Sequence, residues 1–234
     1  MQRRTMIDRT PLSQTVARQL QKMIQSGELP KSERLPSQRV LSEKLGVSRP
    51  SLREALMTLE TLGLIRTQAG RGTYVADPKE LSLSDDAQWR YSDEHDMAHV
   101  FEIRLLLEGQ LARHAAETST LDDIAVLKNA TDQMEAAWER DDLIVNVEAD
   151  QAFHQHIAGK SRNPLLLQTY SSLSNLVTET QRQPIPFTAL DRMAASIAEH
   201  RAVIAAIHGR DAKGAEQAMV THIRNTAACA GINV

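Results

Sequence analysis

Four side chains in the second half of the sequence combine metal-binding residue types with spacings that can bring them together. Asp150 and His154 lie four residues apart, and His200 and His222 follow in later segments. On helices, all four would fall on the apolar face and point into the interior. A buried carboxylate or imidazole without a partner is costly. We therefore predict a divalent metal site, with zinc as the first choice and nickel or manganese as alternatives.

The inward direction of these residues follows from their neighbours. Apolar side chains recur every three or four positions around them. A hydrogen-bonded core histidine would explain any one of these histidines taken alone. The other histidines lack this pattern: His156 is expected to be exposed, His208 to lie at a helix end, and the rest to be surface residues. The apolar positions are Leu143, Val147, Ile157, Met193, Ile197, Ile204, Ile207, Ala215 and Met219, and the surface histidines are His95, His99 and His114.

Arg104 and Glu108 are also expected to point inward, because they share a helical stripe with Phe101, Leu111 and Ala115. Two interpretations remain open for this pair. It can be a buried ion pair that holds the helices together. Alternatively, Arg104 and Glu108 can both belong to an effector-binding site, where Arg104 binds the carboxylate of a small effector because the planar guanidinium matches a carboxylate bidentately.

Basic side chains near the N-terminus suggest a second kind of chemistry. Arg49 and Arg53 lie four residues apart, opposite a leucine stripe, and Ser48 and Ser51 stand near the start of the same helix. Arginines on one outward face can read guanine in the major groove, whereas serines suit phosphates. Arg39 and the Gly70-Arg71 tip add further candidate DNA contacts. A solvated charged helix face is the alternative for the two arginines alone.

The elements that must position these basic residues are short. The spacing predicts a helix over 12–24, a helix capped by Ser37 with Val40, Leu41 and Leu45 facing inward, and a third helix capped by Ser48. Gly46 closes the second helix. Runs at 64–67 and 73–75 flank a glycine-rich turn and predict a hairpin. Residues 1–76 are therefore predicted to form a winged helix-turn-helix DNA-binding domain.

The rest of the chain reads as a linker over 77–95 and an all-helical domain over 96–234. Helical patterns occupy 96–117, 121–140, 142–159, 164–181, 188–208 and 211–230, without competing strand signals. The predicted fold class is mainly α, with an antiparallel helical bundle after the winged domain. Residues 76–84 are the candidate coupling element between the two domains.

Charge divides the chain in the same place. Residues 1–78 carry 13 Lys and Arg against 7 Asp and Glu, whereas residues 79–234 carry 14 against 23. A basic N-terminal part indicates a polyanionic partner. Only 3% of the residues are aromatic, which disfavours base-stacking binders of single strands or RNA. The single cysteine and the lack of an 18-residue apolar run predict a cytoplasmic protein without membrane segments.

Residues 27–75, which include LPSQRVLSEKLGVSRPSLREALMTLETLGLIRTQAGRGTYV, resemble the DNA-binding domain of GntR-family bacterial transcription regulators. The helical segment resembles the ligand-sensing domain of the FadR (FCD) branch of that family. The resemblance implies that Arg39, Arg49 and Arg53 contact DNA and that Gly70 lies in the wing. Ser32 stands where the family often has glycine.

The resemblance also bears on the helical domain. Asp150, His154, His200 and His222 match the ligand set of metal-containing FCD domains, and an arginine at the position of Arg104 often contacts the effector there.

We therefore expect a homodimeric repressor that binds an inverted-repeat operator and is released by a small organic acid. The homodimer follows because one winged helix reads only a half-site. Two alternatives stay open: a metal-free sensor of an acyl-CoA-like ligand, and a metal-dependent enzyme fused to a DNA-binding domain. The missing HExxH motif and nucleophile elbow count against the enzyme.

Overall fold

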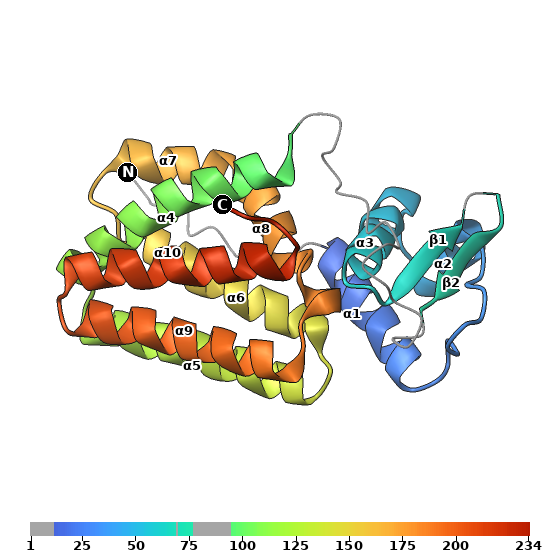
Figure 1. Ribbon diagram of the computed structural model, residues 1–234. Helices are drawn as coiled ribbons and strands as arrows, with labels where there is room; N and C mark the ends of the chain where they lie inside the picture. Colours follow the sequence, from blue (N-terminus) through green and yellow to red (C-terminus); the bar gives the residue numbers. More distant parts are fainter. Residues whose placement is uncertain (1–11, 69, 77–94) are drawn as a thin grey trace, which may run out of the picture. The chain divides into compact units, whose positions relative to one another are not determined.

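The computed structural model describes residues 12–68, 70–76 and 95–234. The chain divides into two compact units, residues 1–85 and 86–234 (Figure 1). The division falls within the predicted linker over 77–95. Residues 77–94, and with them most of the candidate coupling element 76–84, lie outside the described residues, so the predicted domain boundaries stay a prediction.

The first unit is a winged helix-turn-helix, as predicted. It contains α1 (Leu12–Gln25), α2 (Gln38–Leu45), α3 (Arg49–Thr61), β1 (Ile65–Gln68) and β2 (Gly72–Val75). The two strands pair antiparallel, with Ile65 opposite Val75. The chain at Glu33–Leu35 adds to the other edge of β2, because Val75 N donates to Glu33 O and Leu35 N donates to Thr73 O. This extra pairing ties the wing to the segment that leads into α2.

Local capping fixes the turn between α2 and α3. Gly46 ends α2 in the left-handed region, with φ 66°, which costs glycine little. Ser48 then caps α3, accepting the backbone N–H of Ser51. Ser32 adopts φ 61°, so the backbone at this position is left-handed. The inward orientation predicted for Val40 is wrong: its exposed fraction is 41%. In a helix of only two turns, the apolar spacing does not decide which side is covered.

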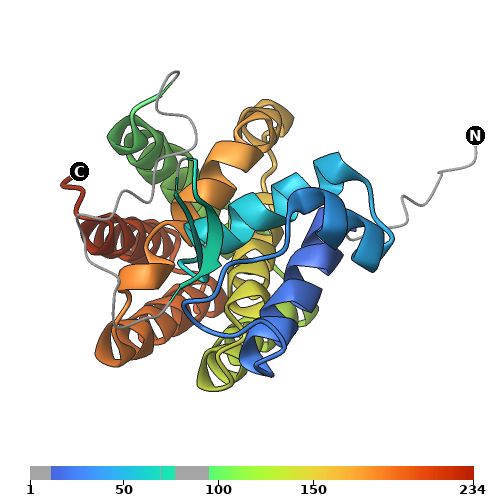
Figure 2. The same ribbon diagram turned by 90° about the vertical axis from the view of Figure 1, so that its right-hand side faces the viewer.

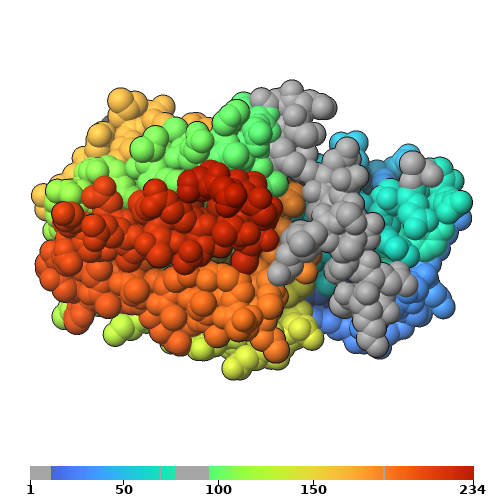
Figure 3. Space-filling model, viewed as in Figure 1, coloured from blue at the N-terminus to red at the C-terminus, as the bar shows by residue number. Residues whose placement is uncertain are grey.

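The second unit is an antiparallel bundle of helices. Figure 2 looks roughly along their axes and shows them surrounding a common interior. The long helices pack in pairs, α4 against α10, α5 against α6, and α9 against both α10 and α5. In Figure 3, α9 and α10 form one continuous outer face of the unit. The elements are α4 (Met97–Thr118), α5 (Leu121–Glu139), α6 (Leu143–Ala158), α7 (Pro164–Ser172), α8 (Ser174–Arg182), the 3-10 turn η2 (Ile185–Phe187), α9 (Leu190–His208) and α10 (Ala212–Cys229).

Small residues let the two most closely packed helices approach. Gly109 of α4 faces α10, and a Cβ at this position would come within 3.0 Å of Val220 Cγ2. Around this contact, the core is built from alanines and a few large side chains such as Phe101 and Phe153, both with no exposed surface. The core joins α4, α6, α9 and α10, and the polar cluster lies on these helices.

One predicted helix is wrong in detail. The pattern over 164–181 was expected to be continuous, but the structure breaks it at Leu173 into α7 and α8. Hydroxyl groups before the break bond to backbone carbonyls: Ser171 Oγ donates to Leu167 O, and Ser172 Oγ donates to Thr169 O. Such bonds offer the backbone an alternative to regular helix pairing.

Within the described ranges, no helix is both long enough and apolar enough to span a lipid bilayer.

Candidate metal centre

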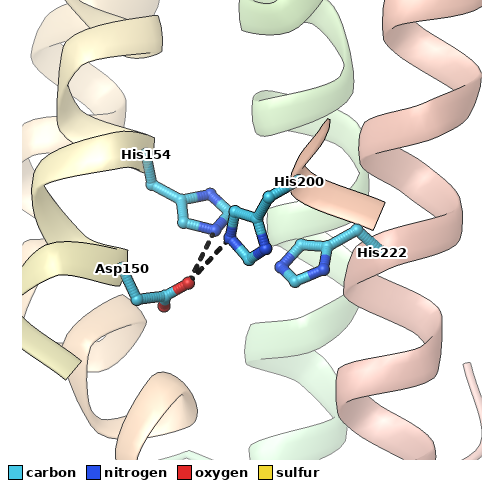
Figure 4. A group of neighbouring side chains, drawn as sticks. All are labelled: Asp150, His154, His200 and His222. Atoms are coloured by element: carbon cyan, nitrogen blue, oxygen red, sulfur yellow. Dashed lines mark hydrogen bonds and ion pairs between the residues drawn. The ribbon is translucent and has the colours of Figure 1, made fainter. Parts of the chain in front are cut away.

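Asp150, His154, His200 and His222 converge inside the helical unit (Figure 4). The first two come from α6, His200 comes from α9 and His222 from α10. Each offers one ligand atom, and these atoms all lie within 4.8 Å of one another. The three histidines are buried and Asp150 is half-buried. The structure thus brings together the whole set that the sequence placed on inward faces.

Each histidine uses its Nδ1 for a hydrogen bond away from the centre of the cluster. His154 Nδ1 lies 2.5 Å from Glu108 Oε2, His200 Nδ1 lies 2.8 Å from the carbonyl of Ser196, and His222 Nδ1 lies 3.0 Å from Glu199 Oε2. Carboxylate and carbonyl oxygens only accept, so each Nδ1 is the donor. This fixes the tautomer: when the rings are neutral, every Nε2 carries a lone pair.

These lone pairs face the carboxylate of Asp150 and one another. His200 Nε2 lies 2.9 Å from Asp150 Oδ1, and His154 Nε2 lies 3.6 Å from the same oxygen. His154 Nε2 is buried and has no hydrogen-bond partner among the described residues. Acceptors that point at acceptors require a proton or a cation between them. Three imidazole nitrogens and one carboxylate oxygen form a donor set that fits a divalent transition metal.

The pKa values of the cluster diverge because the neighbours differ. Burial lowers the pKa of both His154 and His222. At His154, the carboxylates of Glu108 and Asp150 outweigh burial and raise the pKa to about 9. At His222, the adjacent His200 adds to burial and the pKa falls to about 3. His154 can therefore hold a proton that a metal would have to displace.

Glu108 links this cluster to Arg104. Both side chains are buried, and Arg104 Nε donates to Glu108 Oε1 at 2.6 Å. Burial opposes ionisation of Glu108, but Arg104 and His154 lower its pKa to about 2. Arg104 Nη1 also donates to Thr180 Oγ1 of α8 at 3.0 Å. The pair is thus a buried ion pair that orients His154, and the effector-binding roles predicted for Arg104 and Glu108 stay predictions.

A second carboxylate, which the sequence analysis did not identify, supports His222. Glu199 accepts from both Nη atoms of Arg192, at 2.7 and 2.6 Å. It also accepts from Asn225 Nδ2 at 2.7 Å. Burial raises the pKa of Glu199, but the hydrogen bonds from His222, Arg192 and Asn225 lower it to about 2. The sequence shows only that Glu199 precedes His200. Its partner His222 lies on α10, and this contact depends on how α9 and α10 pack.

The other histidines lie away from the cluster. His156 was expected to be exposed, and this is wrong: it is half-buried, with Nε2 3.0 Å from Asp123 Oδ1. His114 is half-buried too, with Nδ1 3.0 Å from Ser161 Oγ. The partner of His156 lies in the first turn of α5, and the partner of His114 lies in the turn between α6 and α7. His95 and His99 are exposed, and His208 lies exposed at the end of α9, as expected.

In the N-terminal unit, the predicted DNA-contacting side chains lie on or near the surface. Arg49 and Arg53 are exposed on α3, opposite its buried leucines. Arg39 is exposed on α2 and pairs with Glu43 at 2.9 Å. The remaining predicted contacts are the exposed Ser48, Gly70 and Arg71 and the half-buried Ser51. Because an exposed ion pair contributes little stability, the pairing with Glu43 does not prevent Arg39 from contacting DNA.

Comparisons with known proteins agree with this two-part organisation. Residues 12–75 match the gntR family of bacterial regulatory proteins, and residues 99–225 match the FCD domain. The chain is similar to the solved structure of E. coli McbR/YncC, with a TM-score of 0.53 and 20% sequence identity. The matched region covers 94% of this chain and 97% of that protein's chain. That likeness concerns the fold.

Two curated relatives are transcriptional regulators. The HTH-type transcriptional repressor NanR of Klebsiella aerogenes is 31% identical over 97% of this chain and 88% of its own length. The Glc operon transcriptional activator of Escherichia coli K12 is 35% identical over 73% of this chain and 68% of its own length. These relatives are regulators and not enzymes. The chain therefore belongs to the GntR family of bacterial regulatory proteins, as a DNA-binding transcriptional regulator with an effector-binding FCD domain.

Proposed function

We propose that this regulator is a homodimeric repressor whose operator affinity falls when a small organic acid binds beside a metal ion in the helical unit. The observation that carries the proposal is the clustering of Asp150 with three histidines whose ligand atoms lie within 4.8 Å of one another, while every Nδ1 is already hydrogen-bonded elsewhere. Without a cation, the Nε2 lone pairs and the Asp150 carboxylate would face one another as acceptors without donors.

Asp150, His154, His200 and His222 would hold the ion, with zinc as the first choice and nickel or manganese as alternatives. A bound divalent ion with free coordination positions supplies an anchor for a carboxylate or hydroxyl oxygen of the effector. The protein's own contribution is orientation: Glu108, Glu199 and the carbonyl of Ser196 fix the three imidazoles.

Arg49 and Arg53 are the proposed base readers, and Arg39, Ser48, Ser51, Gly70 and Arg71 the supporting contacts to the DNA. The exposed face of α3 is suited to the major groove, where an arginine can bond to guanine O6 and N7. One winged helix covers a half-site, so an inverted-repeat operator requires two copies of the chain. The repressor in the comparison spans nearly the whole chain, which favours repression over activation.

Effector binding changes operator affinity only if the effector prefers one conformation of the protein. The natural test is operator release, measured by fluorescence anisotropy, for metal-loaded and chelator-treated protein with a panel of carboxylic acids. We expect an acid to release the operator only from metal-loaded protein. Metal analysis of the purified protein should give one ion per chain.

The double variant His200→Ala and His222→Ala is the matched control. It should lose the metal and the response to acid, and keep operator affinity, because the DNA-reading unit is untouched. A double variant that still releases DNA on acid addition would show that the pocket assignment is wrong. A protein that binds no metal after supplementation, but responds to an acyl-CoA, would instead be the metal-free sensor.

A further inference from the structure

A small cavity adjoins the metal centre. Its volume is about 50 Å³, and the residues that line it include Asp150 and His222 of the metal centre together with Arg104, Gln181 and Arg192. One water molecule needs about 10–15 Å³ on this measure. The cavity therefore has room for about three to five water molecules, or for a small organic acid, whose bonded atoms lie closer together than separate waters. An acyl-CoA is far larger than this space.

Gln181, which lines this cavity, has a hydrogen-bond donor that is not used. Its residue is only 6% exposed, and its Nε2 has no hydrogen-bond partner among the described residues. An unpaired buried donor destabilises a folded protein, because its hydrogen bonds to water are lost and not replaced. Arg104 and Arg192, in contrast, are each bonded to a carboxylate, Glu108 and Glu199.

The backbone next to Gln181 is anchored to the site. The neighbouring Thr180 is fully buried; its Oγ1 accepts from Arg104 Nη1 at 3.0 Å and donates to Val177 O at 2.7 Å. Arg104 in turn bonds to Glu108, which orients His154. The end of α8 that carries Gln181 is thereby fixed relative to the metal centre.

We infer that the effector is a carboxylic acid of about two to four carbons with a hydroxyl or keto oxygen, and that Gln181 Nε2 donates to that hydroxyl or keto oxygen. This deepens the proposed function and rests on it. The amide N–H groups only donate, so the matching ligand atom must be an acceptor. A short acid with two kinds of oxygen can reach the metal centre and Gln181 within one small cavity.

Gln181 also lines a second void, of about 10 Å³, together with Gln151 and Tyr170. Gln151 Nε2 likewise has no partner among the described side chains. A water shared by Gln151 and Gln181 is therefore the rival explanation for the unpaired amide. The rival predicts that the two glutamines behave alike, whereas the inference predicts that only Gln181 affects ligand binding.

The test compares lactate with propionate, which lacks the hydroxyl group, by titration calorimetry on metal-loaded protein. The wild type should bind lactate at least about tenfold more tightly than propionate, the ratio that 1.4 kcal/mol represents. Gln181→Met should reduce this ratio to about threefold or less. It should also raise the Tm of the ligand-free protein by about 2–4 °C, because an unpaired donor is removed.

Gln183→Met is the matched control. Gln183 is 3% exposed and its Nε2 also has no partner in the described chain, but it is not among the cavity-lining residues. It should raise Tm without changing the lactate-to-propionate ratio, and Gln151→Met should do the same. An unchanged ratio in Gln181→Met, or an equal loss in Gln151→Met or Gln183→Met, would overturn the role of Gln181.

Gluconate, a six-carbon acid, tests the size limit. It should bind at least about tenfold more weakly than lactate, and equal binding would overturn the size limit while leaving the proposed function intact. If no carboxylic acid in the panel binds to metal-loaded wild-type protein, the proposed function itself fails.

Discussion

Replacing Glu199 by glutamine should weaken metal binding without changing any proposed metal ligand. Glu199 Oε2 accepts from His222 Nδ1 at 3.0 Å and from Arg192 Nη2 at 2.6 Å. Its Oε1 accepts from Asn225 Nδ2 and from Arg192 Nη1, both at 2.7 Å. All four partners are donors. In Glu199→Gln, one of the two oxygens becomes an NH₂ group that faces donors, so one end of this network must come apart.

The expected magnitude follows from the role of Glu199 as the partner of a ligand. Removing such partners typically lowers metal affinity by about 10–100-fold, which corresponds to about 1.4–2.8 kcal/mol. We expect this loss because His222 then either turns its ring or loses its anionic acceptor. Arg192 is half-buried, so its loss of a charged partner is partly compensated by water.

Competition with a chromophoric zinc chelator measures the affinity directly, and circular dichroism checks that the helical content is unchanged. Glu135→Gln is the matched control: Glu135 pairs with Arg201 at 2.6 Å on the surface, away from the histidines. It should leave metal affinity unchanged. If Glu199→Gln binds zinc within a factor of about two of the wild type, or if Glu135→Gln weakens binding equally, orientation of His222 by Glu199 is refuted.

Three further predictions concern other parts of the chain. Arg49→Ala and Arg53→Ala should each cost about 1–3 kcal/mol of operator binding and relax base preference; anisotropy titrations with operator and random DNA check this, and an equal loss on both would mean that the arginine contacts only phosphate. Asp123 should stabilise the fold only above acidic pH. The side chain of Lys160 and the N–H of Thr120 hold the pKa of Asp123 well below its usual range, so its contribution is full above about pH 5 and is lost progressively as the pH falls further. The difference in unfolding free energy between wild type and Asp123→Asn, measured in urea, should thus shrink between pH 5 and pH 3, and a constant difference would contradict the shift. Ser48→Ala should cost about 0.5–2 kcal/mol of stability by removing the cap of α3, whereas an unchanged midpoint of thermal unfolding would show that the cap contributes little.

The parts of the fold that could be predicted from sequence depend on local rules. Ser37, Gly46 and Ser48 mark helix ends because capping involves residues only three or four apart. The inward faces of α4, α6, α9 and α10 were predictable because apolar residues repeat with the helical period. Where the local signal was short or mixed, as at Val40 and Leu173, the prediction was wrong.

Residue types and their spacing were enough to predict a GntR-type regulator with four metal-binding side chains on inward helix faces. The groups that surround these side chains become apparent only in the folded protein. Glu108 and Glu199 bond to histidines 46 and 23 residues away, and the unpaired amide of Gln181 meets a cavity built by several helices. Helical periodicity says which side of a helix is buried. It carries no information on which neighbour covers that side, because this depends on how the helices pack.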